Sequence, residues 1–290
     1  MRGALLTELK QPPAPAGLDE PRPGEGEVLV QIEAVALNPL DLSVGSGAFY
    51  GGHPPLPYAP GCEAVGRTAD GALVYLFGDG RGVARDGFLA ERVAVPADLP
   101  LALPEGTDAA LAAAAGIAGI AGWVPVAWKA KVTPDDRVLV LGGTGTVGRV
   151  ATQAARLLGA RQVVAVGSKE LDRIAEEFAD GGFTVCIDPV WGEPLADALA
   201  HAARHARVVH VGQSAGPQAP LRSADVRGKE LTILGHSNFA LSKEERDRAY
   251  LELLDHLTAG RIELELQRFP LEDVAAAWRN QRGGKSVVVF

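Results

Sequence analysis

The middle of the chain combines short apolar runs with amphipathic segments. Val138–Leu141 is a run of four aliphatic residues, which is typical of a strand buried on both faces of a parallel sheet. A glycine-rich turn follows it, and apolar residues then recur at helical spacing, namely Val150, Ala151, Ala154, Leu157 and Leu158. Gly159 is placed to end this helix. The pattern predicts a strand, a tight turn and a helix, in that order.

Alternating strand and helix patterns continue to about residue 235. We expect strands at Gln162–Val166, Thr184–Ile187, Val208–Val211 and Leu231–Gly235, and helices at Glu170–Phe178 and Pro194–Arg204. Strands separated by helical segments of this length predict a parallel sheet covered by helices on both faces, with right-handed connections. The middle of the chain is therefore predicted to be an α/β domain of the Rossmann type, a doubly wound parallel sheet.

The two ends of the chain have a different pattern. Residues 4–103 are rich in proline, glycine and short β-prone runs, with expected strands at Glu27–Val35, Ala64–Thr68, Ala72–Phe77 and Leu89–Val95. The end of the chain predicts, in order, a helix, a strand, a helix and a strand at Lys243–Ala259, Ile262–Phe269, Leu271–Arg282 and Ser286–Phe290. Because a terminal strand needs a partner sheet, we expect the tail to return to the first β domain. We therefore assign residues 1–107 and 237–290 to one domain, and residues 108–236 to the dinucleotide-binding domain.

Ala109–Trp128 is about twenty residues long and carries no charge, which is the length that crosses a bilayer. Its apolar residues are mostly alanine. Gly116, Gly119, Gly122 and Pro125 favour a tightly packed helix of a protein core over a helix that faces lipid.

The composition indicates which partners the protein can bind and in which compartment we expect it. The 290 residues are 47% hydrophobic, which is ample for a core, and the net charge of -8 argues against nucleic acid and anionic membranes as partners. Two cysteines cannot make a disulfide framework and are normal for a reducing cytosol. The first residues do not resemble a signal peptide. We expect a cytoplasmic protein.

Gly143, Gly145 and Gly148 form the complete pattern G-x-G-x-x-G between the predicted strand and helix. One glycine allows the tight turn, the next lets backbone N–H groups approach a pyrophosphate, and the third lets the helix pack on the strand. The helix N-terminus favours the negative charge. The alternative is a turn with a purely structural role. We predict cofactor contacts from Gly143, Thr144, Gly145, Thr146, Val147 and Gly148.

The end of the next strand indicates which nicotinamide cofactor is bound. NAD-specific turns place Asp or Glu about twenty residues after the glycines, to hold the ribose 2′-hydroxyl. Here the strand is followed by Gly167, Ser168 and Lys169, and Arg173 lies one helical turn farther. These groups suit a 2′-phosphate, so we predict NADP(H). The sequence does not choose between Lys169 and Arg173, and both could instead belong to a solvated helix face paired with neighbouring acids.

Two later strand ends are further candidates, because ligands lie beyond the carboxyl ends of parallel strands. Gly212, Gln213 and Ser214 follow one strand and are expected near the nicotinamide, although this turn could be only a connector. His236 and Asn238 follow the last parallel strand and are candidates for the same reason.

At this point three segments show a family resemblance. Residues 138–160, VLVLGGTGTVGRVATQAARLLGA, resemble the cofactor turn of the medium-chain dehydrogenase/reductase superfamily. EVLVQIEAVALNPLDLSVGSG and LPYAPGCEAVG resemble its N-terminal domain, and residues 251–290 resemble its ending. Within the superfamily, N-P-x-D and LPYAPG are most similar to the quinone oxidoreductase branch. The resemblance implies a GroES-like catalytic domain built from both chain ends, a Rossmann domain between them, and a homodimer.

The resemblance also bears on zinc. Relatives with catalytic zinc carry cysteine in the segment aligned with ALNPLDL and histidine in a G-H-E motif, where this chain has Asn38 and Cys62. A catalytic zinc needs three protein ligands, which one thiol beside a carboxylate does not supply. The four-cysteine structural lobe is absent as well. We therefore predict a zinc-independent enzyme, with Cys62 as a small buried residue.

Without a Lewis acid, conjugated acceptors such as quinones or enones are favoured over simple alcohols as partners for hydride transfer. The resemblance places Asn38 near the nicotinamide, and the alternative is a turn around Pro39 with a local cap. Related enoyl reductases have a tyrosine where this chain has Phe49, which is followed by Tyr50. Tyr50 or water is the expected proton donor. Lys285 resembles a family position near the cofactor.

Two alternatives stay open at this stage. One is an NADPH-binding sensor or interaction protein with little activity, and the other is an enoyl reductase that lacks the usual tyrosine.

Overall fold

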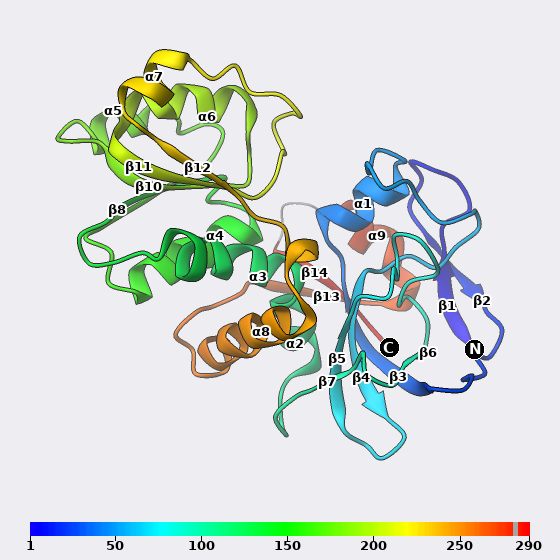
Figure 1. The fold of residues 1–290 in the computed structure, drawn as a ribbon. Coiled ribbons are helices and arrows are strands. Elements are labelled where there is room, and N and C mark those ends of the chain that lie inside the picture. Colours follow the sequence, from blue (N-terminus) through cyan, green and yellow to red (C-terminus); the bar gives the residue numbers. More distant parts are fainter. Residues whose placement is uncertain (281–283) are drawn as a thin grey trace. The chain divides into compact units, whose positions relative to one another are not determined.

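The computed structural model describes residues 1–280 and 284–290, and the chain forms two compact units (Figure 1). Unit 1 comprises Met1–Ile117 with Leu264–Phe290, and unit 2 comprises Ala118–Glu263. The sequence placed the two changes of domain at 107/108 and 236/237 instead. Unit 2 extends farther because α8 (Lys243–Thr258) is held there, where Glu252 Oε2 accepts hydrogen bonds from the indoles of Trp123 and Trp128, both at 3.0 Å.

Unit 1 is built on one seven-stranded sheet in the order β13-β14-β3-β4-β5-β7, with β6 also paired to β3. Its strands are β3 (Glu27–Ala36), β4 (Glu63–Thr68), β5 (Leu73–Phe77), β6 (Arg92–Pro96), β7 (Leu101–Ala102), β13 (Leu266–Pro270) and β14 (Lys285–Val289). Antiparallel pairing of β14 with β3 confirms the predicted return of the last strand to the first β domain. Both ends of the chain therefore build this sheet.

Shorter elements complete unit 1. They are β1 (Arg2–Leu5), β2 (Ala14–Gly17), α1 (Pro39–Gly45), α2 (Ala109–Ala115), η4 (Leu271–Asp273) and α9 (Val274–Arg279). The predicted helix Leu271–Arg282 is thus a 3-10 turn followed by a short α-helix, and its last two residues lie outside the described residues. The apolar faces of β3 to β6 supply the core, in which Ile32, Leu76 and Phe88 are almost fully buried.

Unit 2 contains a five-stranded parallel sheet in the order β12-β11-β10-β8-β9. Its strands are β8 (Arg137–Leu141), β9 (Gln162–Val166), β10 (Phe183–Asp188), β11 (Ala202–His210) and β12 (Thr232–Gly235). The strand order reverses between β8 and β10, which is the position where doubly wound sheets bind ligands. The predicted Rossmann-type sheet is confirmed.

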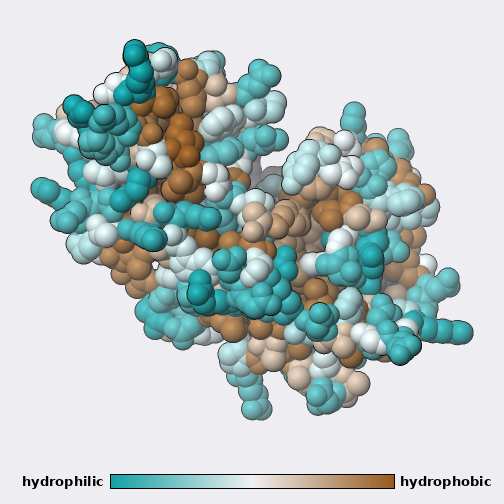
Figure 2. Space-filling model, in the orientation of Figure 1, coloured by the Kyte–Doolittle hydropathy of each residue, from teal (hydrophilic) through white to brown (hydrophobic). Residues whose placement is uncertain are grey.

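Helices cover both faces of this sheet. Figure 1 shows α5 (Arg173–Glu177), α6 (Gly192–Ala198) and α7 (Ser223–Gly228) on one face, and α3 (Ile117–Val124), α4 (Thr146–Leu157) and α8 on the other. The edge strand β12 is largely exposed, and Figure 2 shows an apolar strip close to α6 and β12. The remaining short helices are η1 (Pro125–Ala130), η2 (Leu199–His201) and η3 (Asn238–Ala240).

Three sequence predictions in unit 2 were wrong in extent. The helix expected at Pro194–Arg204 ends at His201, and β11 begins at Ala202, well before the expected Val208. Ala202 pairs with Phe183 of β10, so pairing between strands overrides the local helical pattern. The helix expected at Glu170–Phe178 is shortened to α5.

The apolar run Ala109–Trp128 is divided into α2, α3 and η1, with breaks at Gly116 and Pro125. Among the described residues, no single helix has the length and apolar character needed to cross a membrane. One bent pair, Ala109–Ala115 with Ile117–Ala130, meets the criteria of length and composition.

Candidate functional site

Unit 1 contains a cluster of polar side chains inside its sheet, which we call the buried polar group. It comprises Asn38, Asp41, Cys62, Glu63, Tyr75 and Lys285. Asn38 caps α1, Glu63 begins β4, and Lys285 begins β14, so strand pairing brings together residues from both ends of the chain. Such a group is stable only if its members satisfy one another.

Glu63 is the centre of the buried polar group and is fully buried. Its Oε1 accepts from Asn38 Nδ2 at 2.7 Å, and its Oε2 accepts from Tyr75 Oη at 2.7 Å and from the Ile117 backbone N–H at 2.6 Å. The Lys285 ammonium lies 3.9 Å away. The backbone at Gly116 approaches so closely that a Cβ there would lie 1.8 Å from Glu63 Oε2. Only glycine leaves room for this carboxylate.

Lys285 fixes the side chain of Asn38. Its Nζ donates to Asn38 Oδ1, and to the Leu37 carbonyl at 2.9 Å. The Asn38 amide donates to Glu63 and, at 3.2 Å, to the Ala36 carbonyl, so both of its N–H groups are used. Asn38 is only 1% exposed, whereas Tyr50, the other predicted catalytic residue, is 88% exposed and packs against the Phe49 ring at a tilt. These two residues therefore lie in opposite environments, and their catalytic roles stay predictions.

Burial dominates the electrostatics of this group. It raises the pKa of Glu63 and of Asp41, and it lowers the pKa of Lys285; the attraction between Lys285 and the two carboxylates opposes each shift. Burial also raises the pKa of the Cys62 thiol, with the nearby Asp41 charge as the next cause. Cys62 is thus a protonated, buried thiol rather than a reactive thiolate.

Zinc does not fit these residues. In the part of the chain that the structure describes, no group of three His, Cys, Asp or Glu side chains is arranged to hold a metal. Glu63 is fully engaged by hydrogen-bond donors, and a lysine ammonium already lies beside it. A protonated thiol is also a poor ligand for a metal ion.

The predicted cofactor residues of unit 2 follow the carboxyl ends of its parallel strands. The loops after β8, β9, β10, β11 and β12 together form what we call the carboxyl edge. They contain Gly142–Gly145, Gly167–Lys169, Pro189–Gly192, Gly212–Ser214 and His236–Asn238, respectively.

The three motif glycines at this edge differ in what surrounds them. A Cβ at Gly148 would lie 2.3 Å from the Gly142 carbonyl oxygen, and one at Gly143 would lie 2.7 Å from Ala165 Cβ. A Cβ at Gly145 would meet nothing closer than 3.6 Å. The fold therefore requires Gly148 and Gly143, whereas a Cβ at Gly145, the N-cap of α4, would make only an ordinary van der Waals contact. Thr146 and Val147 begin that helix, where backbone N–H groups lack partners within the helix.

Contacts between the loops bring the predicted residues together. The Gly143 N–H donates to the Val166 carbonyl at 3.0 Å, and a Cβ at Gly167 would lie 3.3 Å from Thr144 Cγ2. The turns after β8 and β9 are therefore neighbours. On the other side, Val190 packs against Gly142, and a Cβ at Gly212 would lie 3.0 Å from the Pro189 carbonyl oxygen. The loop after β10 thus joins the glycine turn to Gly212–Ser214.

The charged residues after β9 are not equivalent. Arg173 is bound to Glu170 at 3.2 Å and to Glu177 at 3.1 Å. Glu170 also accepts from the Gly167 N–H at 2.9 Å, which is the main cause of its lowered pKa. The Lys169 ammonium has no ion pair with any other described residue. It is therefore the cation available to an incoming anion, while Arg173 is engaged by its own helix.

Sequence reasoning missed a second set of residues at this edge. Asp188 is fully buried at the end of β10 and accepts from the backbone N–H groups of Val190 and Trp191, at 2.9 and 2.8 Å. Its other oxygen lies 3.3 Å from His210 Nδ1, and the His210 ring packs against the Trp191 ring in a tilted arrangement, with 4.1 Å between the ring centroids. Trp191 has a φ of 61°, a strained value for a bulky residue. An acid that ends an apolar strand was the available sequence signal.

His236 and Asn238 lie beside the end of β11. The His236 N–H donates to the His210 carbonyl at 2.9 Å, and His236 Nε2 lies 2.9 Å from Asn238 Oδ1. Both side chains are buried, with 8% and 7% exposed. The structure thus places these two predicted residues together, in the same row of loops as Gly212.

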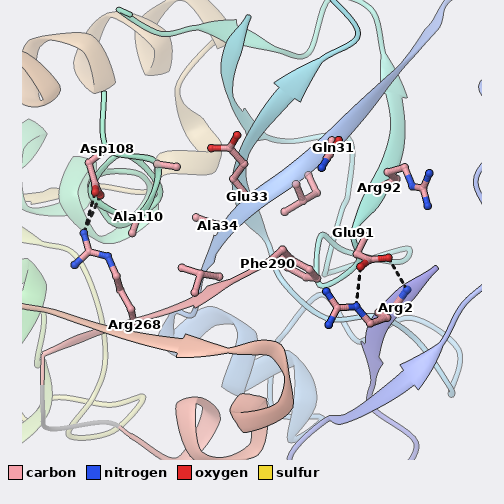
Figure 3. Close-up of a pocket in the computed structure, with 13 residues that line it drawn as sticks. Arg2, Gln31, Glu33, Ala34, Glu91, Arg92, Asp108, Ala110, Arg268 and Phe290 are labelled. Atoms are coloured by element: carbon pink, nitrogen blue, oxygen red, sulfur yellow. Dashed lines mark hydrogen bonds and ion pairs between the residues drawn. The ribbon is translucent and has the colours of Figure 1, made fainter. Parts of the chain in front are cut away.

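A cavity of about 680 Å³ in unit 1 is separate from the buried polar group (Figure 3). Charged residues line it, but they are already paired: Arg268 binds both oxygens of Asp108 at 3.0 Å, and Arg2 binds Glu91 at 2.8 Å. These two arginines therefore have acidic partners of their own within the lining.

Two family models match the chain. One is described as the alcohol dehydrogenase GroES-like domain and matches residues 24–105; the other is described as zinc-binding dehydrogenase and matches residues 158–287. The first covers the strands of unit 1 from β3 to β7. The second lies mainly in unit 2 and continues into the tail.

Curated relatives of similar length include quinone oxidoreductases. That of Homo sapiens is 26% identical over 287 residues, which cover 90% of this chain and 86% of the relative. That of Lama guanicoe is 29% identical over 284 residues, which cover 89% of this chain and 85% of the relative.

Among solved structures, the quinone oxidoreductase of Thermus thermophilus, also determined as a complex with NADPH, is 29% identical with a TM-score of 0.83 and covers all of both chains. An NAD-dependent alcohol dehydrogenase has a TM-score of 0.87 over all of both chains at 24% identity, and it shows the fold alone.

Proposed function

Because the chain belongs to the medium-chain dehydrogenase/reductase superfamily and is quinone oxidoreductase-like, we propose that it is a zinc-independent, NADPH-dependent oxidoreductase. Its proposed acceptor is a quinone, an enone or a similar conjugated carbonyl. The observation that carries this proposal is the carboxyl edge of unit 2, where α4 begins after Gly145 with N–H groups that have no partner within the helix, and where the Lys169 ammonium has no ion pair with another described residue. A dinucleotide phosphate needs both features.

We assign each part of the cofactor to residues of this chain. Backbone N–H groups of Thr146, Val147 and Gly148 at the start of α4 would bind the pyrophosphate. Gly167, Ser168 and Lys169 would hold the adenosine ribose, and Lys169 would pair with the 2′-phosphate. Gly212, Gln213, Ser214, His236 and Asn238 would hold the nicotinamide half.

NADPH, when bound, supplies the hydride for a two-electron reduction of the acceptor. The reduced oxygen then takes a proton, for which we propose Tyr50 or water as the donor. Asn38 is proposed to act near the nicotinamide through its carbonyl oxygen, because both of its N–H groups are already donated within unit 1. The buried polar group then serves to hold that oxygen in place.

Two alternatives come from other observations. A sensor that binds NADPH without turnover would fit the position of Tyr50, because a side chain that is 88% exposed is a poor candidate for a positioned proton donor. An enoyl reductase is disfavoured because Phe49 stands where related enzymes have a tyrosine, although the Tyr50 ring lies beside it, with 4.4 Å between the ring centroids. Purified protein mixed with NADPH and a panel of quinones and enones separates these functions. Acceptor-dependent loss of NADPH absorbance supports the reductase, and tight binding without oxidation supports the sensor.

The cofactor preference is tested at Lys169. We expect Lys169→Ala to weaken NADPH binding roughly tenfold and to leave NADH binding nearly unchanged, since a charge-assisted bond to the 2′-phosphate is lost. Arg173→Ala is the matched control and should have a smaller effect, because its guanidinium is held by Glu170 and Glu177. The double variant should lose NADPH binding much more than NADH binding. Equal losses for both cofactors would refute the assignment to NADP(H).

Two further properties are part of the proposal. A homodimer is proposed from the family resemblance, and light scattering coupled to size-exclusion chromatography measures it. A cytoplasmic location is supported by Cys62 and Cys186, which are both unpaired, buried thiols.

A further inference from the structure

A second cavity of unit 1 lies between α1, α9 and the turn that follows β1, and we call it the α1 groove (Figure 1). Its volume is about 410 Å³, which is within the range of sites for small molecules. Pro39, Leu42 and the Trp278 indole form an apolar wall, and the polar lining includes Lys10 and Ser43. Lys10 and Pro39 are exposed, so the groove is open to solvent and a ligand can enter it.

The apolar wall is fixed by a close contact between α1 and α9. A Cβ at Gly45 would lie 2.7 Å from Trp278 Cζ2, so the indole can lie against α1 only because Gly45 has no side chain. Trp278 is 8% exposed and is therefore held by unit 1 on most of its surface. The wall is thus formed before any ligand arrives, as is usual for small-molecule sites.

Lys10 gives the α1 groove a positive charge. No Asp or Glu is among the described residues that line the groove, although the net charge of the chain is -8. The Lys10 ammonium has no ion pair, and the Ser43 hydroxyl has no hydrogen bond, with another described residue. A free cation and a free hydroxyl beside an apolar wall suit an anion that carries an apolar body.

The backbone at Lys10 is in a conformation that glycine would adopt more easily. The Gln11 N–H donates to the Glu8 carbonyl at 3.4 Å, and Lys10, the third residue of this turn, has a φ of 69°. Glycine or asparagine is preferred at such a position. Lys131 also has a positive φ, of 52°, but it does not line the α1 groove. Backbone strain alone therefore does not identify a site, and Lys131 is a matched control for Lys10.

From the apolar wall and the free cation we infer that the α1 groove binds a small aromatic carboxylate. The carboxylate pairs with the Lys10 ammonium and accepts a hydrogen bond from the Ser43 hydroxyl. The aromatic ring packs against the Trp278 indole, in an offset or edge-to-face arrangement. Inorganic phosphate has no apolar surface for this wall. The site lies in unit 1, and the inference goes beyond the proposed function because it does not depend on the dinucleotide.

Calorimetric titration of the full chain with 2-naphthoate tests the inference. 2-Naphthamide, which lacks the charge, and acetate, which lacks the aromatic body, are the matched probes. We expect each of them to bind at least about fivefold more weakly than 2-naphthoate. Lys10→Gly should weaken the binding of 2-naphthoate about fivefold and leave that of 2-naphthamide unchanged. Lys131→Gly should leave the binding of both unchanged.

Thermal unfolding of the two glycine variants separates binding from folding. Both should have unfolding midpoints close to that of the wild type, because relief of the positive φ offsets the added freedom of the unfolded chain. The inference is overturned if the wild type does not bind 2-naphthoate, or if Lys10→Gly binds it as tightly as Lys131→Gly does. Neither outcome affects the proposed function, which is tested by the binding and oxidation of NADPH.

Discussion

The polar atoms of the buried polar group in unit 1 have partners within the protein, whereas some of those at the carboxyl edge of unit 2 do not. In the first, Glu63 and Lys285 are fully enclosed, and each is held by partners from the same unit. In the second, the Lys169 ammonium has no ion pair and His236 Nδ1 has no partner among the described residues. The contrast teaches that polarity alone does not identify a binding site. Unpaired polar atoms at the ends of parallel strands are the better indicator.

The largest expected effect tests whether the members of the buried polar group depend on one another for their stability. Lys285→Met leaves the Glu63 carboxylate buried without its counter-charge, and we expect it to lower the free energy of unfolding by about 3–5 kcal/mol. Adding Glu63→Gln should restore part of that loss, because the unpaired charge is then removed. Urea denaturation of the single and double variants measures both effects. A loss below about 1 kcal/mol for Lys285→Met would show that the group is not a closed network.

Two variants of the glycine turn separate its contribution to stability from its contribution to NADPH binding. Gly148→Ala places a methyl group 2.3 Å from the Gly142 carbonyl oxygen, and we expect it to cost about 2–3 kcal/mol of stability. Gly145→Ala has its nearest neighbour at 3.6 Å, so it should keep the stability of the wild type while weakening NADPH binding. Thermal unfolding and NADPH titration of both variants decide the matter. Unaltered NADPH affinity in Gly145→Ala would argue against the turn as the pyrophosphate site.

The smallest effect concerns Asp136, which precedes β8 at the opposite edge of the same sheet. Burial raises its pKa, but bonds from Thr184, Thr133 and Arg207 outweigh burial, and the pKa lies below the ordinary value. A carboxylate with a lowered folded pKa stabilises the protein above the unfolded pKa, near 3.8, and this contribution is lost as pH falls through the folded pKa.

We therefore expect Asp136→Asn to cost about 1–2 kcal/mol at pH 7. The difference from the wild type should shrink as pH drops below 4, because the wild-type carboxylate becomes protonated there. Denaturation curves between pH 3 and pH 7 measure this change. A difference that is constant over the whole range would mean that the charge of Asp136 contributes nothing.

The sequence predicted those parts of the fold whose signals are local. Val138–Leu141, the glycine turn and the helix after it occupy adjacent positions, and the structure has all three. The beginning of β11 at Ala202 could not be predicted, because it depends on pairing with Phe183, which is distant in sequence. The order of the strands likewise depends on contacts that no local pattern records.

In the candidate site, too, the sequence predicted the features with local signals and missed those that depend on distant residues. The loops after β8, β9, β11 and β12 were predicted because a glycine or polar segment ends each apolar strand. The alternative that Arg173 belongs to a helix face paired with neighbouring acids agrees with the structure at Glu170, while its second partner, Glu177, was not predicted. The role of Lys285 could not be predicted, because it is 247 positions from Asn38 in sequence and reaches it only through the pairing of β14 with β3. The strained Trp191 has no local sequence signal at all.

The close approach of Glu63 to Gly116 also restricts how this chain can change over generations. Any side chain at position 116 would occupy the space of the carboxylate, 1.8 Å away, so a single substitution there is blocked while Glu63 is present. Loss of Glu63 alone would remove the carboxylate with the strongest attraction for the buried Lys285 ammonium. Positions 63, 116 and 285 are therefore expected to evolve as a linked set, and substitutions in one lineage should occur at these positions together or not at all.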